Sequence, residues 1–501
     1  MTDDAPRLAP DAGSLASAHA EVRETLISVI VLVGDRAVKI KKPVHLPYLD
    51  WRALPARRAA CQREVELNRR LAPDVYLGTA DVAGADGCVF EHLVVMRRMP
   101  EERRLAGLVA RGAPLDAPLD RLAAHIAAFH ATAARSPAIS DAAGRDAVRR
   151  NWEDNLAVLH DAAGTRLDSA GVARVDHLAH AYLAGRGPLF ADRAAAGMAV
   201  DGHGDLLADD IYLLDDGPRV LDCLEFDDRL RAVDVLDDVA FLAMDLEHLG
   251  APSLARAFLG AYRRHSAGHH PASLAHHYIA YRAGVRAKVA VLRAVEGTPG
   301  ASSDARDLLD LARRHLEVGR VRLVLVGGLP GTGKSTLARA LGARAGWPVL
   351  RSDVVRKERA GIASATRAPA GFGEGLYAPV ATDATYRELL RRARRLLERG
   401  ESVVLDASFA SAAHRAGAST VAKATAAELV ALQCQAPATL AAERLARRRR
   451  DDPSDATPAI AAAMAASFAP WPEAAVIDTS ADPDAAVDAA AAALGPLEPA
   501  N

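Results

Sequence analysis

A glycine-rich loop near residue 330 has the residue types and spacing that bind nucleotide phosphates. Residues 328–335, GLPGTGKS, match the pattern G-x-x-x-x-G-K-S/T at every fixed position. The glycines let backbone N–H groups curl around phosphate oxygens, Lys334 can reach the β- and γ-phosphates, and the Ser335 hydroxyl can hold Mg²⁺. The apolar segment VRLVLVG precedes the loop and a helical pattern follows it. A plain glycine turn would not combine these three elements, so the sequence predicts a nucleotide site.

Two carboxylates follow strand-like segments near this loop. Asp406 ends the apolar run VVL, where a Walker-B residue would hold an Mg²⁺-bound water. Asp353 lies in RSDVVR at the end of another predicted strand, and it could accept the proton of an acceptor hydroxyl while Arg356 steadies the acceptor. Asp353 could instead serve only as the N-cap of the following helix.

The arginine-rich run 444–450 precedes the acidic segment DDPSDAT. Most of its arginines fit a solvated helix face, and we predict that Arg444 and Arg448 close over the nucleotide as lid residues. Alternatively, the run binds nucleic acid and this domain phosphorylates oligonucleotide ends. The net charge of −2 over the whole chain argues against nucleic acid as the main partner without excluding it. The Gly-, Ala- and Pro-rich segment 361–385 is expected on the acceptor side.

Together these motifs resemble the small P-loop kinases, which include gluconate kinase, chloramphenicol phosphotransferase, zeta toxins and phage polynucleotide kinases. The resemblance covers residues 320–480 and implies ATP and Mg²⁺ as cofactors. It implies catalytic roles for Lys334 and Asp353 and metal-binding roles for Ser335 and Asp406. The nucleotide-binding residues would be Gly328, Gly331, Thr332, Gly333, Lys334, Ser335, Thr336 and Arg448.

The segment 201–247 contains 15 acidic and three basic residues. Within it, the motif His203-Gly-Asp205 precedes Asp210, and Asp222 follows a short hairpin pattern. Phosphoryl transfer requires one base for the acceptor hydroxyl and oxygen ligands for Mg²⁺. We therefore predict Asp205 as the base, with Asp210 and Asp222 as metal ligands. By charge complementarity, the acidic surroundings favour a cationic or sugar-like, polyhydroxylated small molecule as the hydroxyl acceptor.

This stretch resembles the aminoglycoside phosphotransferase family, whose bilobal fold is shared with protein kinases. The family pattern H-G-D-x-x-x-x-N maps onto residues 203–210, with Asp210 in place of the Asn. An extra negative charge there would change the metal balance and could slow transfer. Asp234 and Asp238 match a downstream stretch that is mostly structural in the family.

The resemblance further implies a strand lysine that places ATP and a helix glutamate that pairs with the lysine. Lys39, in AVKI, is the first choice and Lys41, on the same strand face, the second. Glu64 is the expected partner, and residues 94–100 would form the adenine hinge. Alternatively, the lysines guard an edge strand, and residues 94–100 form a buried edge strand. Because no Gly-rich loop precedes Lys39, a further alternative makes this half a nucleotide-binding pseudokinase that regulates the C-terminal domain.

The elements that would position these residues form two halves. The first reads as a hairpin over 26–40, a helix over 56–71, a second β region over 75–96, and then mostly helices. The second alternates five short apolar strands with helices, as in a parallel α/β sheet. We therefore predict an α+β bilobal protein-kinase-like domain, followed by an α/β P-loop NTPase domain. The expected boundaries are a tail over 1–25, an N-lobe over 26–100, a helical C-lobe over 101–300, a linker helix over 301–319 and the P-loop domain over 320–501.

The length of 501 residues requires more than one domain. The four cysteines are far apart, which excludes a disulfide framework or zinc knuckle and fits a reducing compartment. No secretory signal pattern opens the chain, and no uncharged apolar run approaches the ~18–20 residues that cross a bilayer. We predict a cytoplasmic, bifunctional ATP-dependent small-molecule kinase with no membrane partner, and its oligomeric state is left open.

Overall fold

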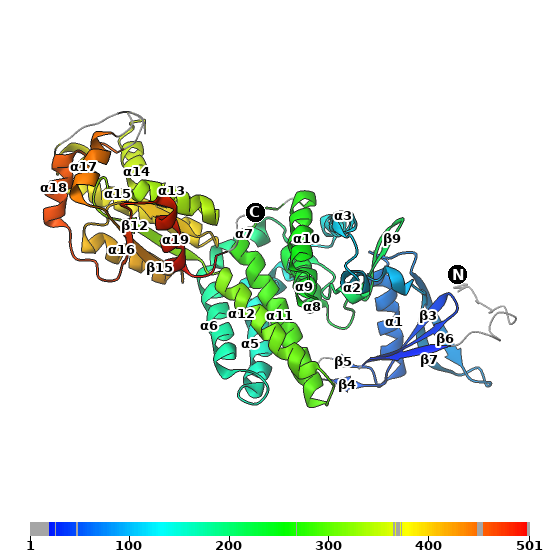
Figure 1. Ribbon diagram of the computed structural model, residues 1–501. Coiled ribbons are helices and arrows are strands. Elements are labelled where there is room, and N and C mark those ends of the chain that lie inside the picture. The colour runs from blue at the N-terminus through cyan, green and yellow to red at the C-terminus, as the bar shows by residue number, and fades with distance from the viewer. Residues whose placement is uncertain are drawn as a thin grey trace. The chain divides into compact units, whose positions relative to one another are not determined.

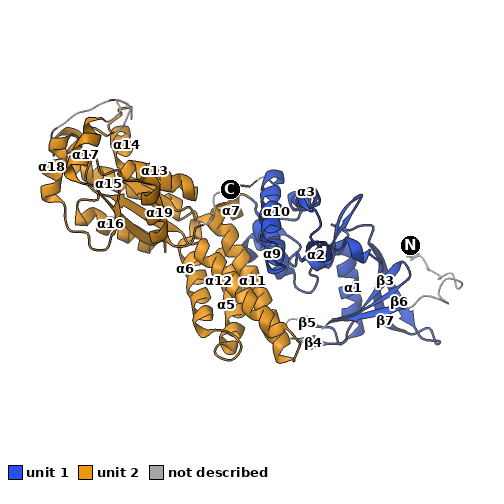
Figure 2. Ribbon diagram, in the orientation of Figure 1, with its two compact units in different colours: residues 1–143, 197–269 blue, residues 144–196, 270–501 orange. Residues whose placement is uncertain are grey.

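The computed structural model describes residues 20–25, 27–46, 49–266, 268–363, 366, 371, 373–447 and 454–497. The chain forms two compact units (Figure 2). The first contains the residues up to Ala143 together with Gly197–His269, and the second contains Gly144–Ala196 together with His270–Asn501. The helical region predicted as one lobe, residues 101–300, is thus shared between the two units.

The first unit begins with a five-stranded antiparallel sheet in the order β1-β2-β3-β7-β6 (Figure 1). Its strands are β1 (Glu21–Glu24), β2 (Ser28–Val33), β3 (Arg36–Lys41), β6 (Tyr76–Ala83) and β7 (Val89–Arg97). Helix α1 (Leu54–Asn68) packs against β6 and β7, and the core between them contains Cys61, Val65 and Val94. The predicted hairpin, helix and second β region are confirmed, whereas β1 was not predicted.

The rest of the first unit is mainly helical and carries the loops of the acidic segment. Its helices are α2 (Leu105–Ala110), α3 (Asp116–Thr132), α4 (Pro137–Ala142), α8 (Asp228–Arg231), α9 (Val235–His248) and α10 (Pro252–His265). Two short antiparallel pairs flank the loops: β8 (Ala199–Asp201) with β11 (Ala232–Asp234), and β9 (Ile211–Leu214) with β10 (Gly217–Val220). Most side chains of α9 are buried, so this helix supports the loops from below the surface.

The second unit combines a helical bundle with a parallel sheet. The bundle contains α5 (Arg145–Ala162), α6 (Ser169–Gly185), α7 (Gly187–Ala195), α11 (Ala272–Val295) and α12 (Ala301–Val318). Helix α12 occupies the residues predicted as a linker helix. It packs along α11 and α6, and Leu308, Leu309 and Leu316 are buried. The predicted linker is therefore a full member of the bundle.

The parallel sheet has the strand order β13-β14-β12-β15-β16. Its strands are β12 (Arg322–Gly327), β13 (Val349–Arg351), β14 (Val403–Asp406), β15 (Glu428–Gln435) and β16 (Ala475–Asp478). The connecting helices are α13 (Lys334–Ala345), α14 (Ser352–Arg359), α15 (Pro379–Leu397), α16 (Ala412–Ala424), α17 (Ala438–Ala446), α18 (Pro458–Ser467) and α19 (Pro483–Leu494). All five predicted strands are present, and the predicted fold class is confirmed for both halves.

Among the described residues, no helix is both long enough and apolar enough to cross a membrane.

Candidate functional sites

The predicted phosphate loop connects the carboxyl end of β12 to the first turn of α13. Gly331 and Gly333 adopt positive φ angles of 84° and 85°. A Cβ atom on Gly331 would lie 2.4 Å from the Ala441 carbonyl oxygen, so this position requires glycine. Lys334 Nζ donates a hydrogen bond to the Leu329 carbonyl oxygen at 2.7 Å, which places the ammonium group over the loop. The glycines and the lysine thus form a cradle that suits phosphate groups.

The cradle opens into a cavity of about 670 Å³. Arg444 and Arg447 both line it, so the predicted lid residue Arg444 lies at the site and is joined by a residue that the sequence did not single out. Arg444 Nη2 donates to the Thr479 carbonyl oxygen at 2.7 Å, while its buried Nη1 has no hydrogen-bond partner in the described part of the chain. The second predicted lid residue, Arg448, lies outside the described residues. The loop residues that line the cavity are Gly331, Gly333, Lys334, Ser335 and Thr336.

Two other predicted loop residues support the cradle from behind. Gly328 approaches β15 so closely that a Cβ atom there would lie 2.5 Å from the Cys434 carbonyl oxygen. The buried Thr332 hydroxyl donates to the Leu329 carbonyl oxygen at 2.8 Å. Both residues therefore shape the loop and do not line the cavity.

Arg351, at the end of β13, lies between the two groups predicted to hold Mg²⁺. Its Nε donates to Asp406 Oδ2 at 3.1 Å, and its Nη2 donates to Ser335 Oγ at 3.4 Å. Asp406 is 5 % exposed and pairs in register with Arg351 across the parallel strands. A hydroxyl and a carboxylate suit a hard cation such as Mg²⁺. In this structure the guanidinium group supplies that positive charge.

Asp353 lies in the first turn of α14, next to the expected acceptor side. Burial raises the pKa of its carboxyl group, and the nearby Arg356 opposes this shift only in part. Arg356 Nη1 donates to the Leu376 carbonyl oxygen at 2.9 Å, and its guanidinium lies 4.5 Å from the centre of the Tyr377 ring. Arg356 therefore holds part of the segment predicted on the acceptor side. A carboxylate with a raised pKa is better suited to accept a proton than an ordinary aspartate.

In the first unit, Lys39 connects the two acidic groups that were predicted around it. Its Nζ lies 2.9 Å from Glu64 Oε1 and 2.6 Å from Asp222 Oδ1. Burial would lower the pKa of this ammonium group, but the charges of Asp222 and Glu64 outweigh burial and raise it. Lys39, Asp210 and Asp222 line a cavity of about 460 Å³. Met96, Met99 and Pro100 form another part of its wall, where the adenine hinge was predicted.

Lys41, the second choice for the ATP lysine, also contacts Glu64. Its Nζ lies 2.5 Å from Glu64 Oε2, contacts Glu225, and lies 4.7 Å from the centre of the Trp51 ring. Glu64 is completely buried and is therefore shared by two lysines. The contact with Asp222 distinguishes the two and favours Lys39 as the residue that reaches the nucleotide cavity.

Asp210, which replaces the family asparagine, lies beside two other aspartates. Burial, followed by the charges of Asp222 and Asp205, raises the pKa of its carboxyl group well above the ordinary value. Asp222 behaves oppositely: burial would raise its pKa, but Lys39 outweighs burial and lowers it. The charges of Asp205, Asp210 and Asp222 thus act on one another at this site.

The loop that carries Asp205 is fixed by a carboxylate from α9. Asp238 Oδ2 accepts a hydrogen bond from the His203 backbone N–H at 2.7 Å, and Oδ1 accepts one from the Gly204 N–H at 2.8 Å. His130 Nε2 contacts Asp238 Oδ2 at 3.0 Å. The buried His203 ring bonds to the Leu221 carbonyl oxygen at 3.1 Å, and burial lowers its pKa to about 4. Asp238, expected to be mostly structural, therefore positions the predicted catalytic loop directly.

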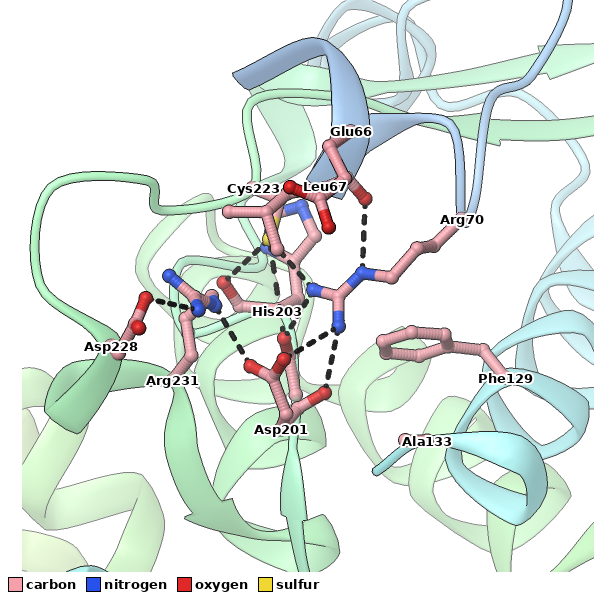
Figure 3. A network of polar contacts seen from close by, with 12 residues as sticks. Glu66, Leu67, Arg70, Phe129, Ala133, Asp201, His203, Cys223, Asp228 and Arg231 are labelled. Carbon is pink, nitrogen blue, oxygen red and sulfur yellow. Dashed lines mark hydrogen bonds and ion pairs between the residues drawn. The ribbon is translucent and has the colours of Figure 1, made fainter. Parts of the chain in front are cut away.

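A second group of ion pairs fixes the strand before this loop, as Figure 3 shows. Arg231 Nε lies 2.8 Å from Asp201 Oδ1, and Arg70 Nη1 lies 3.2 Å from Asp201 Oδ2. Arg70 Nη2 also donates to the Gly202 carbonyl oxygen at 2.9 Å. The two arginines thus hold β8 from both sides just before His203.

Replacing Asp238 by Ala should lower the free energy of unfolding by about 3–5 kcal/mol, because it leaves His130 and two backbone donors buried without their acceptor. Burial would raise the pKa of Asp238, but bonds from His130 and the loop hold it below its ordinary value. This carboxylate therefore stabilises the fold fully above the pKa of the unfolded residue and progressively less as the pH falls below it. Denaturant unfolding gives the free energy of unfolding of the wild type and of Asp238→Ala at each pH. The difference between these two free energies should become smaller as the pH falls from 7 to 3.5. The exposed Asp215→Ala is the control, and a difference that is constant with pH would contradict this role.

The residues that the sequence did not single out include His130, Arg351 and Arg447. Arg351 was visible in the RSDVVR motif, but only the pairing of β13 with β14 shows that it faces Asp406. His130 had no sequence signal, because it lies 108 residues before its partner Asp238.

One family model matches the part of the chain that carries the phosphate loop, and relatives match almost its whole length. The family model described as an AAA domain matches residues 323–471, which include the phosphate loop, Asp353 and Asp406. The uncharacterized proteins Rv2004c of Mycobacterium tuberculosis and Mb2027c of Mycobacterium bovis are each 45% identical to the chain over 460 residues. The match covers 92% of this chain and 92% of each relative.

Solved structures resemble separate parts of the chain. A choline/ethanolamine kinase family protein from Mesorhizobium loti covers 61% of this chain and 90% of its own, with 15% identity and a TM-score of 0.40. A gluconokinase from Sinorhizobium meliloti covers 34% of this chain and 90% of its own, with 19% identity and a TM-score of 0.25. The chain combines a kinase-like fold with a P-loop NTPase fold. The strand orders of the two five-stranded sheets identify these folds, and the overall similarities to solved structures do not.

Proposed function

The chain belongs to one family with Rv2004c and Mb2027c over 92% of its length, and from this premise we propose that it is an ATP-dependent kinase with two phosphotransfer sites. Each site would transfer the γ-phosphate of ATP to a hydroxyl group of a small molecule. The observation that supports the proposal most strongly is that each unit surrounds its own cavity with a lysine and with oxygen atoms suited to Mg²⁺.

At the C-terminal site, Lys334 and the loop N–H groups would bind the β- and γ-phosphates, and Ser335 and Asp406 would hold Mg²⁺. Asp353 would accept the proton of the acceptor hydroxyl as the new oxygen–phosphorus bond forms and the bond to the leaving ADP oxygen breaks. The raised pKa of Asp353 supports this role. When bound, Mg²⁺ would neutralise phosphate charge.

At the N-terminal site, Lys39 would bind ATP phosphates with Glu64 holding the lysine in place. Asp210 and Asp222 would bind Mg²⁺, and Asp205 would accept the proton of the acceptor. The contact of Lys39 with both Glu64 and Asp222 supports this arrangement. The acidic segment supports a cationic or polyhydroxylated acceptor, because its charge attracts such molecules.

A transfer screen with radiolabelled ATP tests the proposal. The acceptors are sugars, aminoglycosides, nucleosides and oligonucleotides, and the proteins are the wild type, Asp205→Ala and Lys334→Ala. We expect Asp205→Ala to abolish the labelling of at least one small-molecule acceptor. Lys334→Ala should abolish the labelling of at least one acceptor that Asp205→Ala still labels. Labelling of oligonucleotides alone would contradict the small-molecule assignment and support the end-kinase alternative.

A further inference from the structure

Arg351 contacts both groups that are proposed to hold Mg²⁺ at the C-terminal site, and the proposed function gives this arginine no role. The parallel pairing of β13 with β14 places it opposite Asp406. Its Nε donates to Asp406 Oδ2 at 3.1 Å, and its Nη2 donates to Ser335 Oγ at 3.4 Å. One guanidinium group therefore bridges the hydroxyl and the carboxylate that a shared cation would bind.

Arg351 also lines the cavity in which the nucleotide would bind. Its side chain is 18 % exposed, and it forms part of the wall together with Lys334 and Ser335. Asp406, in contrast, is buried. The arginine thus contacts the buried carboxylate and lines the space proposed for the nucleotide phosphates. A guanidinium group in this place can bind either the carboxylate or phosphate oxygens, because both accept charge-assisted hydrogen bonds.

The wall of this cavity has an excess of positive charge. Among the described residues that line it, five are cationic and one is a carboxylate. The cationic residues are Lys334, Arg339, Arg351, Arg444 and Arg447, and the carboxylate is Asp484. A nucleoside triphosphate carries more negative charge without Mg²⁺ than with it. A wall with this excess therefore attracts the metal-free nucleotide more strongly than the Mg²⁺ complex.

Arg351 and Mg²⁺ would compete for the same oxygen atoms. A serine hydroxyl and an aspartate carboxylate are ligands that Mg²⁺ prefers. Two cations in contact with these oxygens would repel each other strongly, because the site is largely shielded from water. Arg351 would therefore have to leave Asp406 and Ser335 when Mg²⁺ binds there. Its planar group of N–H donors matches phosphate oxygens, so the nucleotide offers it a new partner within the same cavity.

We propose that Arg351 and Mg²⁺ are alternative cations at one position of the C-terminal site, so that this site binds a nucleoside triphosphate both without and with Mg²⁺. The inference rests on the proposed nucleotide site at the phosphate loop. In the metal-free complex, Arg351 supplies the positive charge beside Asp406 and the phosphates. In the complex with Mg²⁺, Arg351 leaves Asp406 and Ser335 and donates to phosphate oxygens. The nucleotide can therefore bind before the metal ion.

Calorimetric titration with a non-hydrolysable ATP analogue, in excess chelator and again in excess Mg²⁺, tests the proposal. All proteins carry Lys39→Met, so that binding at the N-terminal site does not obscure the result. The quantity compared is the Kd in chelator divided by the Kd in Mg²⁺. Arg351→Gln should raise this ratio by about tenfold or more, because it removes charged donors from the metal-free complex and a competitor from the Mg²⁺ position.

Arg339→Gln is the matched control, because Arg339 lines the same cavity but bonds to the Ser335 backbone carbonyl oxygen, at 3.0 Å. It should leave the ratio at the parent value. Arg351→Met, which keeps the length of the side chain, replaces Arg351→Gln if that variant does not fold. A parent protein that binds the analogue only with Mg²⁺, or a folded Arg351 variant with the parent ratio, would overturn the proposal. Binding that survives Lys334→Ala would instead contradict the nucleotide site at the phosphate loop.

Discussion

Replacing Lys334 by Ala will reduce phosphate transfer at the C-terminal site by roughly 100- to 1,000-fold or more, since removal of even one neutral preorganised hydrogen-bond donor from an active site has an effect of that size. The ammonium group lies over the phosphate loop, 2.7 Å from the Leu329 carbonyl oxygen. The ammonium group of Lys334 can leave the Leu329 carbonyl oxygen and bind phosphate oxygens while the loop keeps its conformation. Single-turnover transfer from radiolabelled ATP, measured with an acceptor from the screen, gives the rate.

Lys423→Ala is the matched control for this experiment, because Lys423 is an exposed lysine on α16 of the same unit. It should transfer phosphate at the wild-type rate. If Lys334→Ala kept the rate for every acceptor, the phosphate loop would not be a site of phosphotransfer.

Replacing Asp205 by Asn will reduce transfer at the N-terminal site by roughly 10²- to 10⁴-fold, the usual contribution of a general base. ATP affinity should change little, because Lys39 and Asp222, and not Asp205, line the nucleotide cavity. The loop should keep its conformation, since Asp238 holds the backbone of His203 and Gly204 and does not depend on the Asp205 side chain. Transfer and ATP binding are measured separately in a Lys334→Ala background.

Asp209→Asn serves as the control, since Asp209 is a neighbouring aspartate whose side chain is 70% exposed. It should leave the transfer rate unchanged. An Asp205→Asn protein that transfers phosphate as fast as its parent would contradict catalysis at this site and would favour the pseudokinase alternative.

The sequence was most informative where chemistry depends on neighbouring residues. The phosphate loop is a continuous motif, and its glycines, Lys334 and Ser335 can be read without knowledge of the fold. Lys39 and Glu64 were paired through the resemblance to the kinase-like family, and strand alternation added only that Lys41 shares the face of Lys39. Asp238 was located as part of a motif, but its hydrogen bonds to the loop of Asp205 depend on the packing of α9 against β11 and the residues that precede β9.

Contacts between distant segments could not be predicted in this way. Arg351 meets Ser335 and Asp406 only because β13 and β14 pair in one register. The packing of α12 into the bundle was missed because its first residues, Ala301 to Asp304, follow turn residues and have linker-like composition.

The number of ATP molecules that one chain binds tests the central claim most directly. Equilibrium dialysis with a non-hydrolysable ATP analogue and Mg²⁺ should give two bound molecules per wild-type chain. The same measurement should give one for Lys334→Ala, one for Lys39→Met, and none for the double variant. A single bound molecule in the wild type that one of these substitutions removes and the other leaves in place would contradict a chain with two phosphotransfer sites.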